Sequence, residues 1–160
     1  MRGYPMQPAE ILDKLEKEFP FDRFDCYFTI VYVLLSVENG ELTYGCAGHV
    51  PPLIMGRYNK LEALNHHGPV IGFGHELPFS QAKTQLKPGD KIILYTDGLI
   101  DNFGPKGDYN GKESFYNSLR RLSDQPVDRI VDGVMAESKK MRAGAIPNDD
   151  MSLLVIEYSG

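Results

Sequence analysis

The residues best able to do chemistry in this sequence are aspartates that border two apolar runs. Asp97 ends the run 91–96, and Asp149 and Asp150 come directly before the run 151–158. A carboxylate at the end of a buried strand is costly unless a turn hydrogen bond or a cation accompanies it. Oxygen ligands without nearby histidine or cysteine suit Mg²⁺ or Mn²⁺.

The two runs indicate how these carboxylates could meet. If the strands at 91–96 and 151–158 are antiparallel neighbours, the end of the first lies beside the start of the second. Asp97 and Asp149 would then share one rim of the sheet, and Asp101 could add a ligand or hold a metal-bound water. A metal ion in such a site activates water and neutralises phosphate charge, so phosphoester hydrolysis is the natural chemistry.

A simpler interpretation of the same aspartates stays open on spacing alone. Aspartate side chains commonly hydrogen-bond the backbone in turns, so Asp97 could cap a turn and Asp149 could cap the start of a strand. No nucleophilic serine motif or phosphate-binding P-loop is present in the sequence to compete with the metal hypothesis.

A short buried strand must position Asp97. Pro88-Gly89 fits the two central positions of a type II turn, so a strand should begin near Lys91. Residues 92–96 are β-branched, aromatic or apolar without polar alternation, which predicts burial on both faces. The segment 79–86 before the turn also ends like a strand, so we expect the buried strand to be one arm of a hairpin.

Hairpins and amphipathic helices account for the rest of the pattern. Asn39-Gly40 predicts a long hairpin, and its two-residue loop would place Cys46 opposite Val33 rather than Cys26. We therefore expect two buried thiols and no disulfide. Further strands are predicted at 52–55 and 60–64, and helices from Pro8 to Phe19, from Gly111 and after Pro126. These elements indicate an α+β domain with an antiparallel sheet.

Composition limits the possible partners. The 160 residues are the size of one domain, with residues 1–7 loose, and the net charge of −5 with a pI near 5.3 argues against binding to nucleic acid or to an anionic membrane. No apolar stretch reaches the length of a membrane helix, and the N-terminus has no secretory pattern. A cytoplasmic location is the expectation.

Three motifs together resemble a known family. They are Gly-Cys-Ala-Gly-His-Val-Pro-Pro-Leu at 45–53, Thr-Asp-Gly-Leu-Ile-Asp at 96–101 and Asn-Asp-Asp-Met-Ser-Leu-Leu-Val at 148–155. In order and spacing they are similar to the SpoIIE-type branch of the metal-dependent type 2C (PPM) protein phosphatases. The resemblance covers nearly the whole chain from about Pro8.

The resemblance implies a fold, a reaction and a set of site residues. The fold would be a β-sandwich of two antiparallel sheets flanked by helices, with two Mn²⁺ or Mg²⁺ ions at its rim. A water bridging the ions would hydrolyse phosphoserine or phosphothreonine. By motif match, Asp97 and Asp149 would be catalytic metal ligands, and Asp101 would lie near a third metal position. The partner would be a phosphoprotein, typically an anti-sigma-factor antagonist in bacterial signalling.

The sequence departs from the family pattern in one respect. Family members carry an earlier Asp-x-x-Gly-His-Gly segment and a further acidic residue that supply metal ligands, and no such segment precedes Pro8. Gly48-His49 belongs to a different motif, in which we expect His49 to be hydrogen-bonded locally. Residues 8–160 are thus expected to form the C-terminal two-thirds of a phosphatase domain, incomplete at the N-terminus.

Two expectations follow from this departure. Metal binding should be weak or absent, and sheet edges left unpaired should favour a homo-oligomer. A noncatalytic module that binds a partner protein through the remaining fold is the alternative to a phosphatase.

Overall fold

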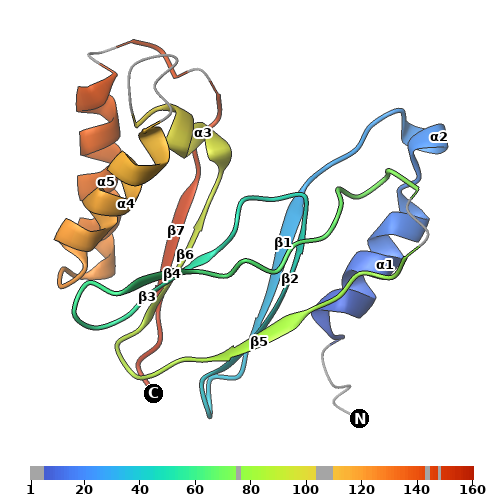
Figure 1. Cartoon of the computed structure of the whole chain (residues 1–160), viewed down its shortest axis with the longest axis horizontal. Coiled ribbons are helices and arrows are strands. Elements are labelled where there is room, and N and C mark those ends of the chain that lie inside the picture. Colours follow the sequence, from blue (N-terminus) through green and yellow to red (C-terminus); the bar gives the residue numbers. More distant parts are fainter. Residues whose placement is uncertain (1–5, 75–76, 104–109, 143–144, 148) are drawn as a thin grey trace. The chain divides into compact units, whose positions relative to one another are not determined.

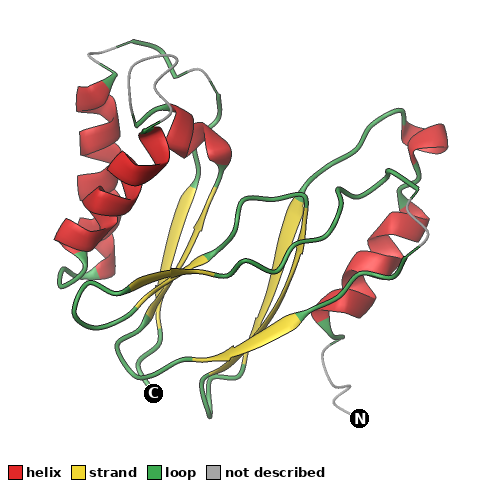
Figure 2. Ribbon diagram, viewed as in Figure 1, coloured by secondary structure: helices red, strands yellow, loops and turns green. Residues whose placement is uncertain are grey.

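A computed structural model of the chain describes residues 6–74, 77–103, 110–142, 145–147 and 149–160. Of the segment 1–7 that the sequence predicts to be loose, residues 1–5 lie outside this description. The chain forms two compact units, one built from residues 1–51, 65–86 and 160, the other from 52–64 and 87–159. Each unit has an antiparallel sheet and its own helices (Figures 1 and 2).

The first unit is a three-stranded sheet with a helix against it. Its strand order is β1-β2-β5, and both pairings are antiparallel. The strands are β1 (Ile30–Leu35), β2 (Glu41–Ala47) and β5 (Ala82–Gln85), and the helices are α1 (Pro8–Glu18) and the single turn α2 (Phe21–Phe24). Residues Leu42 to Ala47 of β2 are all buried, so this central strand carries the core of the unit.

Helix α1 is attached through both of its faces. On the apolar face, Leu12 is fully buried against the sheet, where Gly45 leaves room for it. On the polar face, the Asp13 carboxylate accepts a hydrogen bond from the Phe79 amide at 2.8 Å, and Glu16 accepts bonds from the Gly72 and Gly74 amides at 2.6 and 2.7 Å. The helix predicted from Pro8 is confirmed, and it anchors the loop that follows residue 71.

The β1–β2 hairpin is confirmed, but its predicted register is wrong by two residues. Cys46 pairs with Val31 rather than with Val33. The reason is the loop, in which the Gly40 amide donates to the Ser36 carbonyl at 2.8 Å and the Ser36 amide donates to Glu41 at 2.9 Å. Residues 37–40 therefore form a four-residue loop, and Gly40 adopts the positive φ of 74° that glycine tolerates best.

The second unit is a four-stranded antiparallel sheet with the order β4-β3-β6-β7. Its strands are β3 (Leu53–Met55), β4 (Leu61–Ala63), β6 (Lys91–Tyr95) and β7 (Leu153–Glu157). Its helices are α3 (Asp97–Asp101), α4 (Gly111–Leu122) and α5 (Val127–Met141). Helices α4 and α5 lie side by side, and α5 also contacts β7 (Figure 1).

Strand β6 is the buried centre of this unit, as its composition predicts. Ile92 and Ile93 are almost fully buried, and the Tyr95 ring packs on Phe115 of α4 with centroids 4.9 Å apart. Even Lys91 is 9% exposed, and its ammonium group donates to the Ser123 carbonyl at 3.2 Å. The two neighbouring strands and the helix layer cover β6, so the positions of both of its ends are fixed.

The expected hairpin between the segments 79–86 and 91–96 is wrong. The turn itself forms, since the Asp90 amide donates to the Lys87 carbonyl at 2.9 Å and Gly89 has a φ of 92°. However, β5 pairs with β2 in the first unit, whereas β6 pairs with β3 and β7 in the second. A turn type reports the local path of the chain, and it does not say which strand will become the hydrogen-bonding neighbour. The α+β class with antiparallel sheets is confirmed.

The two cysteines differ in exposure, so the prediction of two buried thiols is half wrong. Cys26 is exposed, whereas Cys46 is 1% exposed and its thiol donates to the His49 carbonyl at 3.0 Å. Burial raises the pKa of the Cys46 thiol, and the weaker effect of the bond to His49 lowers it. The reactive thiolate of Cys46 is thus both scarce and shielded.

Thiol labelling tests this difference. In the native protein at pH 8 we expect one equivalent of a disulfide reagent to react rapidly and the second only after unfolding in denaturant. Cys26→Ser should abolish the rapid phase and Cys46→Ser should leave it unchanged. Rapid reaction of two equivalents in the native protein would contradict the burial of Cys46.

Candidate functional site

The pairing of β6 with β7 brings the two aspartate-bearing segments together. The register runs from Lys91 opposite Glu157 to Tyr95 opposite Leu153. One step further, the Thr96 amide donates to the Ser152 carbonyl at 3.2 Å. The antiparallel arrangement predicted from the sequence is therefore confirmed. The C-terminal end of β6 lies beside the N-terminal end of β7.

Asp97 is the first residue of the short helix α3. The sequence left open that Asp97 lies in a simple turn, and the structure has a helix there instead. Thr96 precedes this helix with extended backbone angles, and the Leu99 amide donates to the Thr96 carbonyl at 3.0 Å. An aspartate in the first turn is favourable because its charge opposes the partial positive charge of the helix N-terminus. A five-residue helix containing glycine has no apolar period, so pattern analysis could not detect it.

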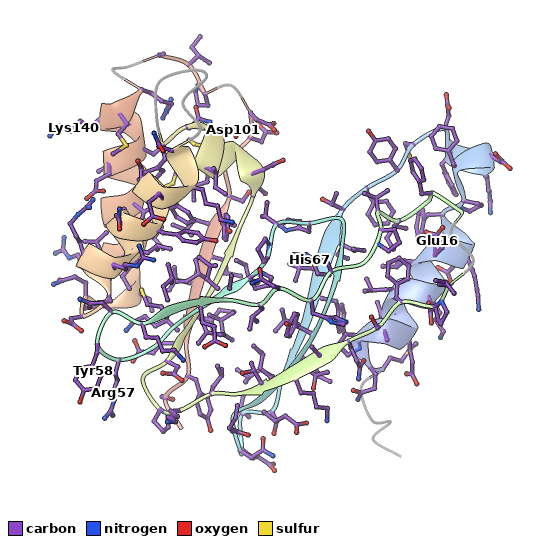
Figure 3. All side chains as sticks on the ribbon, in the orientation of Figure 1. Glu16, Arg57, Tyr58, His67, Asp101 and Lys140 are labelled. Carbon is purple, nitrogen blue, oxygen red and sulfur yellow. The ribbon has the colours of Figure 1, made fainter. Side chains whose placement is uncertain are left out.

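Both α3 aspartates are exposed to solvent. Asp101 lies one helical turn after Asp97, a rise of about 6 Å along the helix axis. Figure 3 shows Asp101 at α3, apart from the sheet of the second unit. Asp97 thus lies at the end of α3 next to the sheet, and Asp101 at the opposite end.

Close backbone contact joins the start of α3 to the segment before β7. A Cβ atom on Gly98 would overlap the carbonyl oxygen of Asp150 and would lie 3.2 Å from the carbonyl carbon of Asp149. Only glycine fits here without a shift of one segment. The structure therefore places the backbones of Asp97 and Asp149 at the same rim, as predicted, while Asn148 of the third motif lies outside the described residues.

Each carboxylate at this rim uses one oxygen locally. Oδ1 of Asp97 accepts a hydrogen bond from the Gly98 amide at 3.0 Å, and Oδ1 of Asp149 accepts one from the Asp150 amide at 2.7 Å. Both residues are exposed, so their other oxygens can meet solvent or an ion. The local bonds agree with the capping interpretation, yet they leave half of each carboxylate for another ligand.

Buried polar groups that sequence analysis did not single out hold α3 in place. The Asn102 side-chain amide, fully buried, donates to the Gly98 carbonyl at 2.6 Å. The hydroxyl of Ser138 on α5, also fully buried, donates to the Asn102 carbonyl at 3.3 Å. Asn102 directly follows Asp101, so its position could have been noticed, but its burial could not be read from the sequence.

The aspartate oxygens are suitable ligands for a hard cation, but they do not form a complete coordination shell. Asp97, Asp101 and Asp149 offer only oxygen, as Mg²⁺ and Mn²⁺ prefer. Within the described residues, no three histidine, cysteine, aspartate or glutamate side chains are grouped closely enough to hold a metal ion. A Mg²⁺ ion commonly keeps several waters and takes one or two carboxylates, so Asp97 and Asp149 fit such a partial ligand set.

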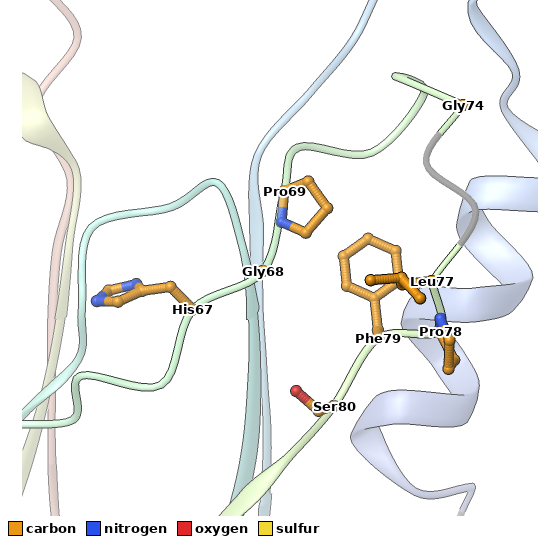
Figure 4. Close-up of a pocket in the computed structure, with 8 residues that line it drawn as sticks. All are labelled: His67, Gly68, Pro69, Gly74, Leu77, Pro78, Phe79 and Ser80. Atoms are coloured by element: carbon orange, nitrogen blue, oxygen red, sulfur yellow. The ribbon is translucent and has the colours of Figure 1, made fainter.

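The first unit contains a separate pocket, which has no acidic lining residue among those described. Its volume is about 570 Å³, and it is lined mainly by loop residues that include His67, Pro69 and Phe79 (Figure 4). His49 of the first motif is hydrogen-bonded locally as expected, through Nδ1 and the Val50 carbonyl at 3.0 Å.

Comparison with known proteins decides the family. The family model described as stage II sporulation protein E (SpoIIE) matches residues 2–159. The chain belongs to the SpoIIE family. Across the described residues, no helix is long and apolar enough to cross a membrane.

Two curated proteins and one solved structure show what this chain is similar to. Protein IcfG of Synechocystis sp. is 25% identical over 81% of this chain and 20% of its own length. Phosphoserine phosphatase RsbP of Bacillus subtilis is 20% identical over 82% of the chain and 31% of its own length. The chain thus spans less than a third of either protein. The SiaA-PP2C domain of Pseudomonas aeruginosa superposes with a TM-score of 0.81 at 19% identity, covering 96% of this chain and 61% of that domain.

The contact at Gly98 yields a stability prediction. Gly98→Ala should lower the free energy of unfolding by about 1–3 kcal/mol, because the added methyl group must displace the Asp150 carbonyl. Urea unfolding followed by circular dichroism measures this change.

Gly133→Ala in α5 is the matched control. Its Cβ would meet the flexible tip of Leu122 at 2.8 Å, and alanine favours a helix by up to about 1 kcal/mol over glycine. We expect this variant to be close to the wild type. Equal destabilisation by the two substitutions would show that the Gly98 contact carries no special constraint.

Proposed function

We propose that this chain provides the catalytic domain of a metal-dependent protein phosphatase, which hydrolyses phosphoserine or phosphothreonine. The observation that supports the proposal best is the shared rim, where the β6–β7 pairing brings together the backbones of Asp97 and Asp149. Membership of the SpoIIE family supports the same reaction class. The metal would be Mn²⁺ or Mg²⁺.

The aspartates have distinct parts in this proposal. Asp97 and Asp149 would hold the metal through the carboxylate oxygens that the local amide bonds leave free. When bound, the metal would activate water and offset the charge of the phosphoryl group. Because each Oδ1 is already fixed by a backbone amide, the carboxylates lose little rotamer freedom on binding. Asp101, at the far end of α3, would contribute to a weaker third position.

The proposed substrate is a phosphoprotein in the cytoplasm, such as an anti-sigma-factor antagonist. The relative RsbP is named a phosphoserine phosphatase, which supports a phosphorylated side chain as the substrate group. The exposure of Asp97, Asp101 and Asp149 also suits a protein-borne phosphate, because a bulky substrate could reach an open rim.

A noncatalytic binding module is the second candidate. It is favoured by the absence of a group of three metal-ligating side chains within the described ranges. In that case the aspartates would act only as local caps, and the fold would serve to bind a partner protein.

We further propose that the chain forms a homo-oligomer through its sheet edges. Strands β1 and β7 each pair on one side only in the described structure. Strand β7 also exposes apolar side chains, with Leu154 at 52% and Ile156 at 37% exposure. An apolar strand with free amide and carbonyl groups is a template for pairing with a second copy.

Asp97→Asn and Asp149→Asn test the metal role. Hydrolysis of a phosphoserine peptide and of p-nitrophenyl phosphate with Mn²⁺ should fall by about 100-fold or more in each variant, because a neutral amide binds a hard cation poorly. Phosphate release measures the rate.

Asp128→Asn is the control, because Asp128 is an exposed aspartate in the first turn of another helix, α5. Its rate should match the wild type. If the wild type itself releases no phosphate over a full Mn²⁺ titration, the binding module would replace the phosphatase as the better account.

Edge pairing is tested by Ile156→Lys. A charge on the edge strand should shift the protein to monomers in sedimentation at micromolar concentration, because pairing would bury the ammonium group. Val37→Lys, at a 69% exposed loop position, should leave the oligomer intact. A wild type that sediments strictly as a monomer would refute the proposal.

A further inference from the structure

Thr96 lies where a helix cap is expected, but its hydroxyl is used elsewhere. It is the residue that precedes α3, and threonine at this position ordinarily accepts a hydrogen bond from an amide in the first helical turn. Here the side chain makes no such bond to α3. Such a cap ordinarily stabilises the start of a helix, so its loss calls for a compensating contact.

The Thr96 hydroxyl instead bridges to the segment that leads into β7. Oγ1 donates to the Asp150 carbonyl at 3.0 Å and accepts from the Ser152 amide at 2.9 Å. Together with the backbone bond from the Thr96 amide to Ser152, this makes three bonds between Thr96 and residues 150–152. The hydroxyl therefore acts as donor and acceptor at once, beyond the last regular pair of the β6–β7 ladder.

This bridge connects the two carboxylates through a short path. On one side, Thr96 is bonded covalently to Asp97. On the other, the hydroxyl holds the carbonyl of Asp150, whose amide donates to Oδ1 of Asp149 at 2.7 Å. The close fit of Gly98 against the Asp150 carbonyl also limits movement of this segment.

We propose that Thr96 is a positioning residue for the metal site, and that its hydroxyl sets the separation of the Asp97 and Asp149 carboxylates. The inference rests on the proposed function, because it assumes that these aspartates hold the cation. Thr96 itself does not bind the ion. Its effect is transmitted through Asp150, as outer-shell groups orient the ligands of metal sites.

The test compares three variants of the full chain by Mn²⁺ binding, measured from the electron paramagnetic resonance signal of free Mn²⁺. Thr96→Val keeps the shape of threonine without the hydroxyl and should weaken Mn²⁺ affinity by about 10-fold. Thr96→Ser keeps the hydroxyl and should retain most of the affinity. Thr84→Val, in β5 of the other unit, controls for the substitution itself and should have no effect.

The outcomes separate positioning from a merely structural role. If Thr96→Val lowers the melting temperature without metal but leaves Mn²⁺ affinity unchanged, the inference is overturned. Equal weakening by Thr96→Ser, or a wild type that binds no Mn²⁺ at millimolar concentration, would also overturn it. Thr96→Ala takes the place of Thr96→Val should that variant not fold.

The proposed phosphatase function is judged by a different measurement. A wild type that binds Mn²⁺ in a Thr96-dependent way but releases no phosphate from a phosphoserine peptide would support the positioning role and count against the phosphatase. A wild type that releases phosphate, but whose Mn²⁺ affinity is unchanged by Thr96→Val, would support the phosphatase and count against the positioning role.

Discussion

The antiparallel pairing of β6 with β7 is the constraint on which the candidate site depends. It aligns two segments that are far apart in the sequence so that one strand ends where the other begins. Hydrogen bonds along the ladder fix the register, and a slip of one residue would turn every side chain of β7 to the opposite face. The positions of Asp97 and Asp149 thus follow from the sheet before either side chain makes a contact of its own.

Burial of β6 makes this alignment rigid, while its end stays open. The strand lies between β3 and β7 and beneath aromatic residues of the helix layer, so its own residues cannot move without creating cavities. At Thr96 the cover ends, and Asp97 is exposed at the first residue of α3. The buried polar groups of Asn102 and Ser138 then hold α3 in place through hydrogen bonds. A fixed frame with exposed carboxylates is the arrangement that a preorganised ion site needs.

Sequence patterns predicted those features that depend on local chemistry. The buried character of β6, the turn at Gly89, the amphipathic α1 and the meeting of the two aspartate segments all follow from residue types and spacing. Three features did not follow. The register at Cys46 depended on loop length, the partner of β5 depended on tertiary pairing, and the five-residue α3 was too short to show a period. The support from Asn102 was likewise hidden, because a buried asparagine and an exposed one look the same in a sequence.

The capping and metal interpretations of the aspartates are not exclusive in this geometry. A carboxylate has two oxygens. The amide that donates to Oδ1 of Asp97 or Asp149 leaves Oδ2 able to bind a second partner, and the carboxylate keeps its negative charge. The same bond removes rotamers that a flexible carboxylate would have to give up on binding an ion, at a cost of roughly 0.5–1.5 kcal/mol per side chain. A local cap therefore prepares each aspartate for a cation. The Thr96 hydroxyl also helps to prepare the site. It makes no cap bond to α3, and it bonds residues 150–152 instead, which holds two separate segments in one register.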